Sequence, residues 1–186
     1  MQGKKLSTAE KRSIRSSYFK YLVPTIIGMV AHCCYCLADV FFVGLSEGAD
    51  GLAALNVALP IFTAYSTFSI MLGVGAATTI SISIGEKNSG RVNQLFTLSV
   101  AGVTLIGACF SVFGTIFIGQ VPYLLGATPL IAGSVSAYLW PINLFAFVYM
   151  LSSALSVIVR NDGNPKLVMI AGTAGNLTNI LLDYVF

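Results

Sequence analysis

Charged residues are scarce in this chain. Only 9% of its 186 residues are Asp, Glu, Lys or Arg, whereas 56% are hydrophobic. In a typical soluble domain, about a quarter of the residues are charged. No charged residue lies between Leu52 and Ile84. At about 1.5 Å per helical residue, this run exceeds the ~30 Å hydrocarbon core of a bilayer. The composition predicts an integral membrane protein and excludes a soluble domain that could bind nucleic acid.

Histidine and cysteine are also few. The single histidine, His32, has no second histidine for a proton relay, so we interpret it as a hydrogen-bonded packing residue. The four cysteines have the spacing of neither a disulfide framework nor a zinc site; they are Cys33, Cys34, Cys36 and Cys109. We expect them to be small buried hydrophobic residues, and the sequence predicts no cofactor.

Clusters of charge divide the chain into a basic tail and five apolar segments. The tail, residues 1–17, is too long and too charged for a usual signal peptide. Because backbone exposed to lipid must satisfy its own hydrogen bonds, all five segments are predicted to be helices. The membrane domain, residues 18–186, is therefore all-α, and its expected spans are 18–45, 52–84, 93–118, 131–158 and 167–186.

Lysine and arginine alternate along the chain in the way that sets membrane topology. Six of the ten lie in the first twenty residues, and the loops at 46–51 and 119–129 have none. The other four follow the second and fourth segments; they are Lys87, Arg91, Arg160 and Lys166. The positive-inside rule then predicts a cytoplasmic N-terminus in the cell membrane. We interpret the basic tail as a topology determinant on the inner leaflet, and not as a nucleic-acid site.

Two carboxylates, Asp39 and Asp183, lie inside the apolar segments, whereas the other five acidic residues lie in the tail or between segments. A carboxylate at membrane depth costs roughly 2.5 to 3.5 kcal/mol by the more conservative scales. Such residues usually serve a cation or proton pathway. The two aspartates are therefore the first candidates for a functional site.

Each aspartate ends a polar stripe with the same spacing. Asn176, Asn179 and Asp183 follow i, i+3, i+7, which places them within about 60° on one helical face. His32, Tyr35 and Asp39 repeat this spacing in the first segment. The two stripes are expected to meet inside the helix bundle, with both carboxylates facing one cavity.

Two carboxylates in one cavity increase each other's affinity for protons or a metal cation. The amide oxygens of the two asparagines are hard neutral ligands, which leans the prediction toward Na⁺ at Asp39, Asn179 and Asp183. An alternative is that Asp183 marks the membrane end and that the asparagines form interhelical hydrogen bonds. A proton needs only the carboxylates, so H⁺ stays open.

Several stretches resemble, in order, the N-terminal half of the multidrug and toxic compound extrusion (MATE) family, DinF-like members included. They are ADVFFVG at 38–44, GLAALNVALP at 51–60, LGVGAATTISISIGEKNSG at 72–90, AYLWP at 137–141, RNDGNPK at 160–166 and GTAGNLTNILLDYVF at 172–186. The resemblance covers nearly the whole chain. It implies the N-lobe of a twelve-helix transporter.

The resemblance also implies a cation or proton site in this lobe. In archaeal and DinF-like members the site uses an Asp of the first span, a Tyr and an Asn of the fourth, and an Asn and an Asp of the fifth. Asp39, Tyr138, Asn179 and Asp183 match these positions. Ser153 stands near the family's fourth-span Asn, which leaves a shorter oxygen ligand.

The implied activity is transport and not enzymatic catalysis. Na⁺ or H⁺ entering from outside would rearrange the aspartate site, bend the first span near Pro24 and help to expel an organic cation or drug. The expected partners are the lipid bilayer, the substrate and a missing C-terminal lobe. We expect a chain truncated near its fifth helix, with a homodimer of half-transporters as an alternative.

Three other readings are weighed against drug export. A lipid-linked oligosaccharide flippase of the same superfamily usually lines its cavity with basic residues, which these spans lack beyond Lys20. An intramembrane aspartyl protease would carry Tyr-Asp and Gly-x-Gly-Asp motifs, which are absent. A non-transporting assembly subunit would tolerate neutral residues at both aspartates.

Overall fold

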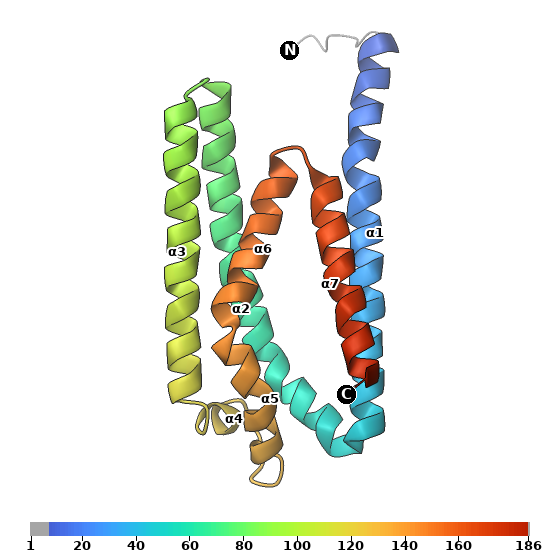
Figure 1. Ribbon diagram of the computed structural model, residues 1–186, viewed down its shortest axis with the longest axis vertical. Helices are drawn as coiled ribbons and strands as arrows, with labels where there is room; N and C mark the ends of the chain where they lie inside the picture. Colours follow the sequence, from blue (N-terminus) through green and yellow to red (C-terminus); the bar gives the residue numbers. More distant parts are fainter. Residues whose placement is uncertain (1–7, 186) are drawn as a thin grey trace, which may run out of the picture. The chain divides into compact units, whose positions relative to one another are not determined.

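The computed structural model describes residues 8–185, and the secondary structure in this range is helical. The helices, in order, are α1 (Thr8–Ser46), α2 (Gly48–Gly85), α3 (Ser89–Ile116), α4 (Val121–Leu124), α5 (Ala132–Leu144), α6 (Ala146–Asn161) and α7 (Pro165–Val185) (Figure 1). The all-α prediction is confirmed. Residues 1–7 of the predicted tail lie outside the described range, and its remainder, from Thr8, belongs to α1.

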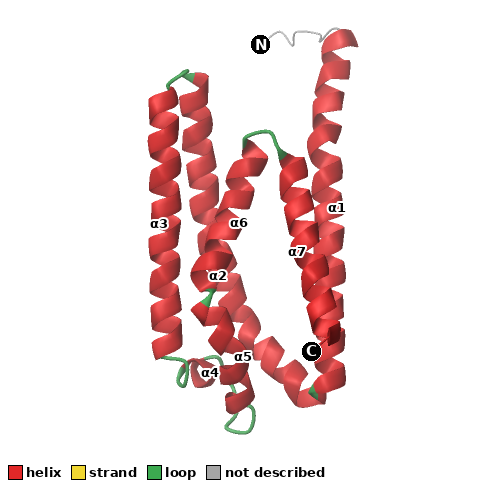
Figure 2. Cartoon of the chain, in the orientation of Figure 1, coloured by secondary structure: helices red, strands yellow, loops and turns green. Residues whose placement is uncertain are grey.

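Most of the predicted spans appear as long apolar helices. In the described part of the chain, three helices are long and apolar enough to cross a membrane: α2, α3 and the part of α1 that begins at Ile14. The bent pair α5–α6 would make a fourth span if its two helices cross together. This pair differs from the single helix expected over 131–158, because its two halves are bent by 57° (Figure 2). Polar side chains lower the hydropathy of α7, which stays a predicted span.

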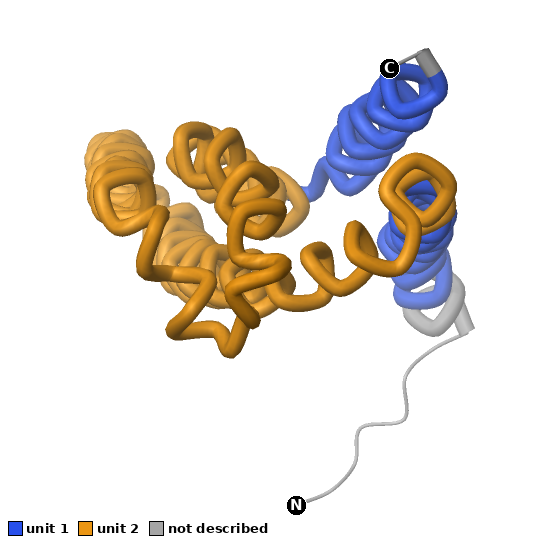
Figure 3. The backbone as a smooth tube through the Cα atoms, turned by 90° about the horizontal axis from the view of Figure 1, so that it is seen from below, with its two compact units in different colours: residues 1–39, 163–186 blue, residues 40–162 orange. Residues whose placement is uncertain are grey.

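Close contacts divide the chain into two units, and each is described by itself (Figure 3). Unit 1 contains the described residues up to Asp39 and those from Gly163 onward, which are most of α1 and all of α7. These two helices run in the same direction (Figure 1). They approach closely at Gly28, where an added Cβ would lie 4.0 Å from the Cα of Met169.

Unit 2, Val40–Asp162, is built on small residues that let its helices approach closely. The buried residues recur every four positions on α3 (Val103, Gly107, Ser111) and on α6 (Ala146, Met150, Ala154, Ile158). Lipid is as apolar as leucine, so helices in a membrane associate through close packing and hydrogen bonds between helices. The core of unit 2 accordingly forms where α2, α3, α5 and α6 meet.

A glycine-to-alanine pair on α3 tests this packing. A Cβ at Gly107 would lie 2.7 Å from the Cα of Phe147, whereas a Cβ at Gly102 would meet nothing within 4 Å. Overpacking against backbone costs about 1–3 kcal/mol, so Gly107→Ala should lower the stability of the purified protein in detergent. Gly102→Ala should be neutral or slightly stabilising, since alanine favours helix. Equal denaturation midpoints for the two variants would contradict this packing.

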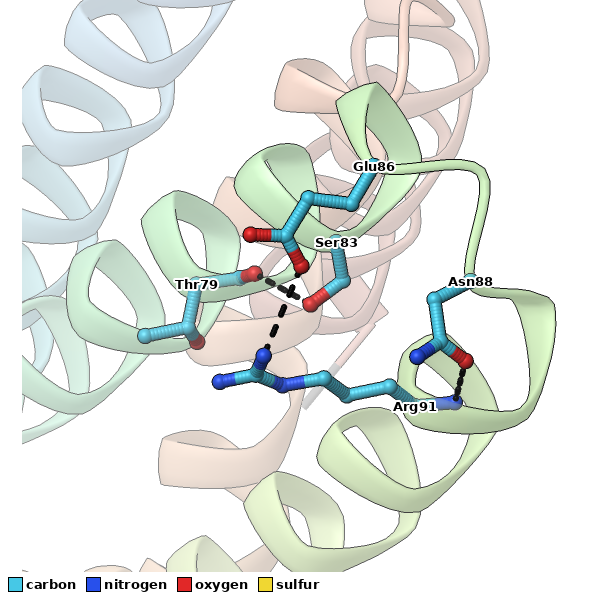
Figure 4. A network of polar contacts seen from close by, with 5 residues as sticks. All are labelled: Thr79, Ser83, Glu86, Asn88 and Arg91. Atoms are coloured by element: carbon cyan, nitrogen blue, oxygen red, sulfur yellow. Dashed lines mark hydrogen bonds and ion pairs between the residues drawn. The ribbon is translucent and has the colours of Figure 1, made fainter.

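The turn between α2 and α3 holds a small polar network (Figure 4). The side-chain oxygen of Asn88 accepts a hydrogen bond from the backbone N–H of Arg91 at 3.1 Å and so caps α3. Arg91 also pairs with Glu86 at 3.4 Å, but both side chains are more than half exposed, so the pair adds little stability. Lys87 turns the chain in the left-handed region, with φ of 56°.

Two further expectations concern α1 and the cysteines. Pro24, the predicted hinge, is buried and lies within the continuous helix α1, so bending there stays a prediction. The four cysteines were expected to be buried, and this was wrong: all are free and exposed. They lie on helix faces that no other described element covers.

Candidate functional site

Asp39 and Asp183 both lie in unit 1, and that their stripes face one cavity stays a prediction. Each lies near the C-terminal end of its helix, and α1 and α7 run in the same direction. From the contact of Gly28 with Met169, Asp39 lies about 17 Å and Asp183 about 21 Å further along the helices. Both side chains are half-buried, and their charges are close enough to interact.

The stripe on α7 contains buried oxygens without a partner. The side-chain oxygens Thr173 Oγ1, Asn179 Oδ1 and Asp183 Oδ2 are shielded from solvent and find no hydrogen bond among the described residues. Asn176 is half-buried on the same face, whereas Leu177 and Leu181 on the opposite side are exposed. Buried polar atoms are normally satisfied, so these orphaned oxygens indicate a place where a cation, a proton or water would bind.

The stripe on α1 is less uniform. Tyr35 is half-buried like Asp39, but His32 is exposed and lies beside the thiol of Cys36, at 3.7 Å between Nε2 and Sγ. Its ring also contacts that of Tyr35, with centroids 5.7 Å apart. These contacts agree with the interpretation of His32 as a packing residue.

Tyr138 and Ser153, implied by the family resemblance, lie in unit 2 and are half-buried on α5 and α6. Tyr138 lines a cavity of about 480 Å³ formed by the end of α1, the start of α2 and the start of α5. Glu47 and Ser134 supply polar groups to the same cavity. Since the units are described separately, the places of Tyr138 and Ser153 in an ion site with the aspartates stay predictions.

An aromatic row continues from this cavity. The ring of Phe62 on α2 lies between Tyr138 on α5 and Tyr149 on α6, with centroids 6.4 Å apart in both pairs. The hydroxyl of Tyr149 is 2.7 Å from that of Ser66, which fixes the far end of the row. Three rings from three helices thus make a continuous aromatic surface.

A second polar cluster, absent from the sequence-based expectations, surrounds the break between α5 and α6. Tyr65 donates a hydrogen bond to the side-chain oxygen of the buried Asn143 at 2.7 Å. Ser111 of α3 contacts backbone groups on both sides of the break. Asparagine within an apolar run was the available signal for Asn143, but serine is too common in these spans for Ser111 to stand out.

Within residues 14–184, no group of three or more His, Cys, Asp or Glu side chains gathers as a transition-metal site would require. The unpartnered oxygens on this face of α7 come instead from amide, hydroxyl and carboxylate groups. Such oxygens are hard ligands that suit alkali or alkaline-earth cations. This set of oxygens could hold a hard cation or a proton.

Comparison with known proteins agrees with this architecture. The chain is 28% identical over 185 residues to the multidrug export protein MepA of Staphylococcus saprophyticus and 27% identical over 183 residues to MepA of Staphylococcus aureus (strain MRSA252). The alignment with the Staphylococcus saprophyticus protein includes 100% of this chain, and the alignment with the Staphylococcus aureus protein includes 98% of it. Each alignment includes 41% of the relative. The chain therefore spans about two fifths of the length of these relatives.

Solved structures show the same fold. The structure of the MATE multidrug transporter DinF-BH in complex with a ligand matches all of this chain and 41% of its own, with a TM-score of 0.88 and 27% identity. An outward-facing multidrug resistance MATE transporter of the MOP superfamily matches 91% of this chain and 38% of its own, with a TM-score of 0.84 and 24% identity. The MatE family model matches residues 24–185, so this chain belongs to the MatE family.

Proposed function

We propose that this chain is the N-terminal lobe of an exporter that exchanges Na⁺ or H⁺ for organic cations. The observation that carries the proposal is the pairing of Asp39 with Asp183 beside buried oxygens that have no partner among the described residues. A structural pair would be expected to have its polar atoms satisfied. In a site that binds an ion transiently, the polar atoms have no partner when the ion is absent.

The coupling ion would bind at Asp183, Asn179 and Asp39. Asn179 and Asp183 are one helical turn apart, about 6 Å along the axis, so their oxygens can reach one ion. Asn176 lies about 10 Å from Asp183 and would line the approach to the ion. Either Na⁺ or H⁺ would relieve the repulsion between the carboxylates, so ion binding would favour the conformation in which they lie close together, and the ion gradient would supply the energy for transport.

The substrate would lie against the aromatic row Tyr138–Phe62–Tyr149. A ring face attracts a cation by about 0.5 to 2 kcal/mol, more when the site excludes water. Planar aromatic cations would also stack on these rings. The solved DinF-BH neighbour is a multidrug transporter with a bound ligand, and the similar relatives are named multidrug export proteins, both of which support an organic substrate.

Export further requires the part of the transporter that this chain does not match. Alternating access rocks one repeat against the other around a central site, so the C-terminal lobe is the essential partner. The positions of Lys and Arg support a cytoplasmic N-terminus in the cell membrane. By the family resemblance, Tyr138 and Ser153 would be further ligands of the ion, and Pro24 would allow α1 to bend.

Imposed ion gradients test the coupling directly. The complete transporter in proteoliposomes is given a fluorescent organic cation on one side and either a Na⁺ gradient or a pH gradient across the membrane. We expect uphill substrate movement with one of the two gradients and its collapse when an ionophore dissipates that gradient. Substrate movement that ignores both gradients would overturn the coupled mechanism.

A further inference from the structure

The break between α5 and α6 lies in a stretch long and apolar enough to cross the membrane as one span. Where a helix ends, its last carbonyls and first N–H groups lose their partners in the helix. At membrane depth such groups must be satisfied by protein, because lipid offers no hydrogen bonds. Side chains of the neighbouring helices therefore have to supply these bonds.

One hydroxyl serves both sides of the break. Ser111 Oγ donates to the backbone carbonyl of Leu144, at the end of α5, and accepts from the backbone N–H of Phe147, at the start of α6, both at 3.3 Å. Ser111 belongs to α3 and is buried. It therefore acts from a neighbouring helix as the cap of two half-helices at once.

A buried amide secures the end of α5. Asn143 accepts a hydrogen bond from the hydroxyl of Tyr65 on α2 and donates one from Nδ2 to the backbone carbonyl of Gly114 on α3, at 3.0 Å. This carbonyl lies in the last turn of α3, where the N–H of Ile118 bonds to Thr115 instead. Asn143 thus ties α5 to two other helices.

Two glycines allow these short bonds. A Cβ at Gly107 would meet the backbone of Phe147 at 2.7 Å, and a Cβ at Gly114 would meet the side chain of Asn143 at 2.8 Å. Any larger residue would separate α3 from the break. The lack of a side chain at both positions brings the backbone of α3 within reach of α5 and α6.

Because Ser111 already bonds the freed groups and Asn143 anchors the end of α5 to α2 and α3, the break is a held bend and not an open ion site. Tyr138 lies before the bend and Ser153 after it. We propose that Tyr65, Ser111 and Asn143 are positioning residues for the transport site: they hold the angle between α5 and α6, and so the distance of Tyr138 from Ser153. The effect on transport rests on the proposed function, whereas the role of these residues in holding the bend does not.

A spin-label distance across the bend tests it first. In a complete transporter without native cysteines, labels are attached at Gly133→Cys, where a side chain meets open space, and at the exposed Asp162→Cys. A straight helix would hold these positions about 5 Å further apart than the 57° bend does. Ser111→Ala and Tyr65→Phe should broaden the distance distribution and shift it toward longer values.

The matched control is Ser156→Ala, whose hydroxyl bonds only within its own helix, to the carbonyl of Ser152 at 2.8 Å. It should leave the distances unchanged. Distributions for Ser111→Ala and Tyr65→Phe that superimpose on the parent would overturn the proposal. Tyr65→Phe is included because it keeps the ring and its packing, so it should fold even if Ser111→Ala does not.

Transport kinetics provide the second readout. Ser111→Ala should raise the KM for substrate and coupling ion roughly three- to tenfold, the range for one interhelical hydrogen bond in a membrane, while Ser111→Thr keeps the hydroxyl and restores the KM. Altered distances with an unchanged KM would refute the positioning role. Efflux that survives neutralisation of Asp39 and Asp183 would instead contradict the proposed function. The spin-label distances would still test whether these side chains hold the bend.

Discussion

Replacing Asp183 with asparagine is expected to abolish cation-coupled efflux in the complete transporter. Asparagine keeps the shape and one oxygen of the side chain but removes its charge, so the site no longer attracts an ion and no longer repels Asp39. At an effective dielectric constant of about 20, a carboxylate about 4 Å from a cation attracts it by about 4 kcal/mol, so its loss should lower the ion affinity roughly 100-fold or more. The same result is expected for Asp39→Asn, measured as drug resistance and as gradient-driven transport.

The control for this experiment is Asp50→Asn. Asp50 is an exposed carboxylate in the first turn of α2, so its neutralisation should leave efflux unchanged. Expression and membrane insertion of all three variants should match the parent, because an asparagine is cheaper at membrane depth than an aspartate. Normal drug resistance in both Asp39→Asn and Asp183→Asn would show that the pair is not the coupling site.

The second large effect is expected at Phe62, the middle of the aromatic row. Phe62→Ala removes the ring that contacts both Tyr138 and Tyr149, so substrate loses a stacking surface and the two tyrosines lose their link. A buried aromatic contact with a cation is worth up to about 2 kcal/mol, so the apparent affinity for planar organic cations should fall roughly tenfold or more. Transport assays at varied substrate concentration measure this as a raised KM.

Another aromatic pair of the same unit offers the comparison. Phe113 on α3 is 61% exposed and stacks on Phe117 with centroids 6.5 Å apart. Phe113→Ala also deletes a ring but should leave the KM unchanged, and Phe62→Tyr should retain most of the affinity. An equal change in KM for Phe62→Ala and Phe113→Ala would mean that the row does not bind substrate.

The aspartate pair could be predicted because helical spacing and membrane topology act together. Asn176, Asn179 and Asp183 share a face by the 3.6-residue period alone, and their common burial confirms it. The first and fifth spans must run in the same direction, since three spans lie between them and successive spans cross in opposite directions. Asp39 and Asp183, each near the end of its span, therefore reach similar depth before any tertiary contact is considered.

Helical periodicity did not predict that the buried hydroxyl of Thr173, on the same stripe, would lack a hydrogen-bond partner among the described residues. Threonine commonly bonds to its own helix backbone, as Thr178 does with the carbonyl of Ala174. Its sequence context therefore looks the same whether or not the hydroxyl is satisfied. Only the packing of α7 shows which threonine lacks a partner among the described residues.

By itself, the sequence determined the membrane class, the helical content, the likeness to MATE transporters and the polar faces of the first and last helices. These depend on composition and on spacing within one helix, which the chain carries locally. The tertiary structure alone decided the bend at Phe145, the cluster of Tyr65, Ser111 and Asn143, and the row of three rings. The cluster and the row each join side chains from three helices. Such meetings depend on how small residues let helices approach one another, and no single helical period contains that information.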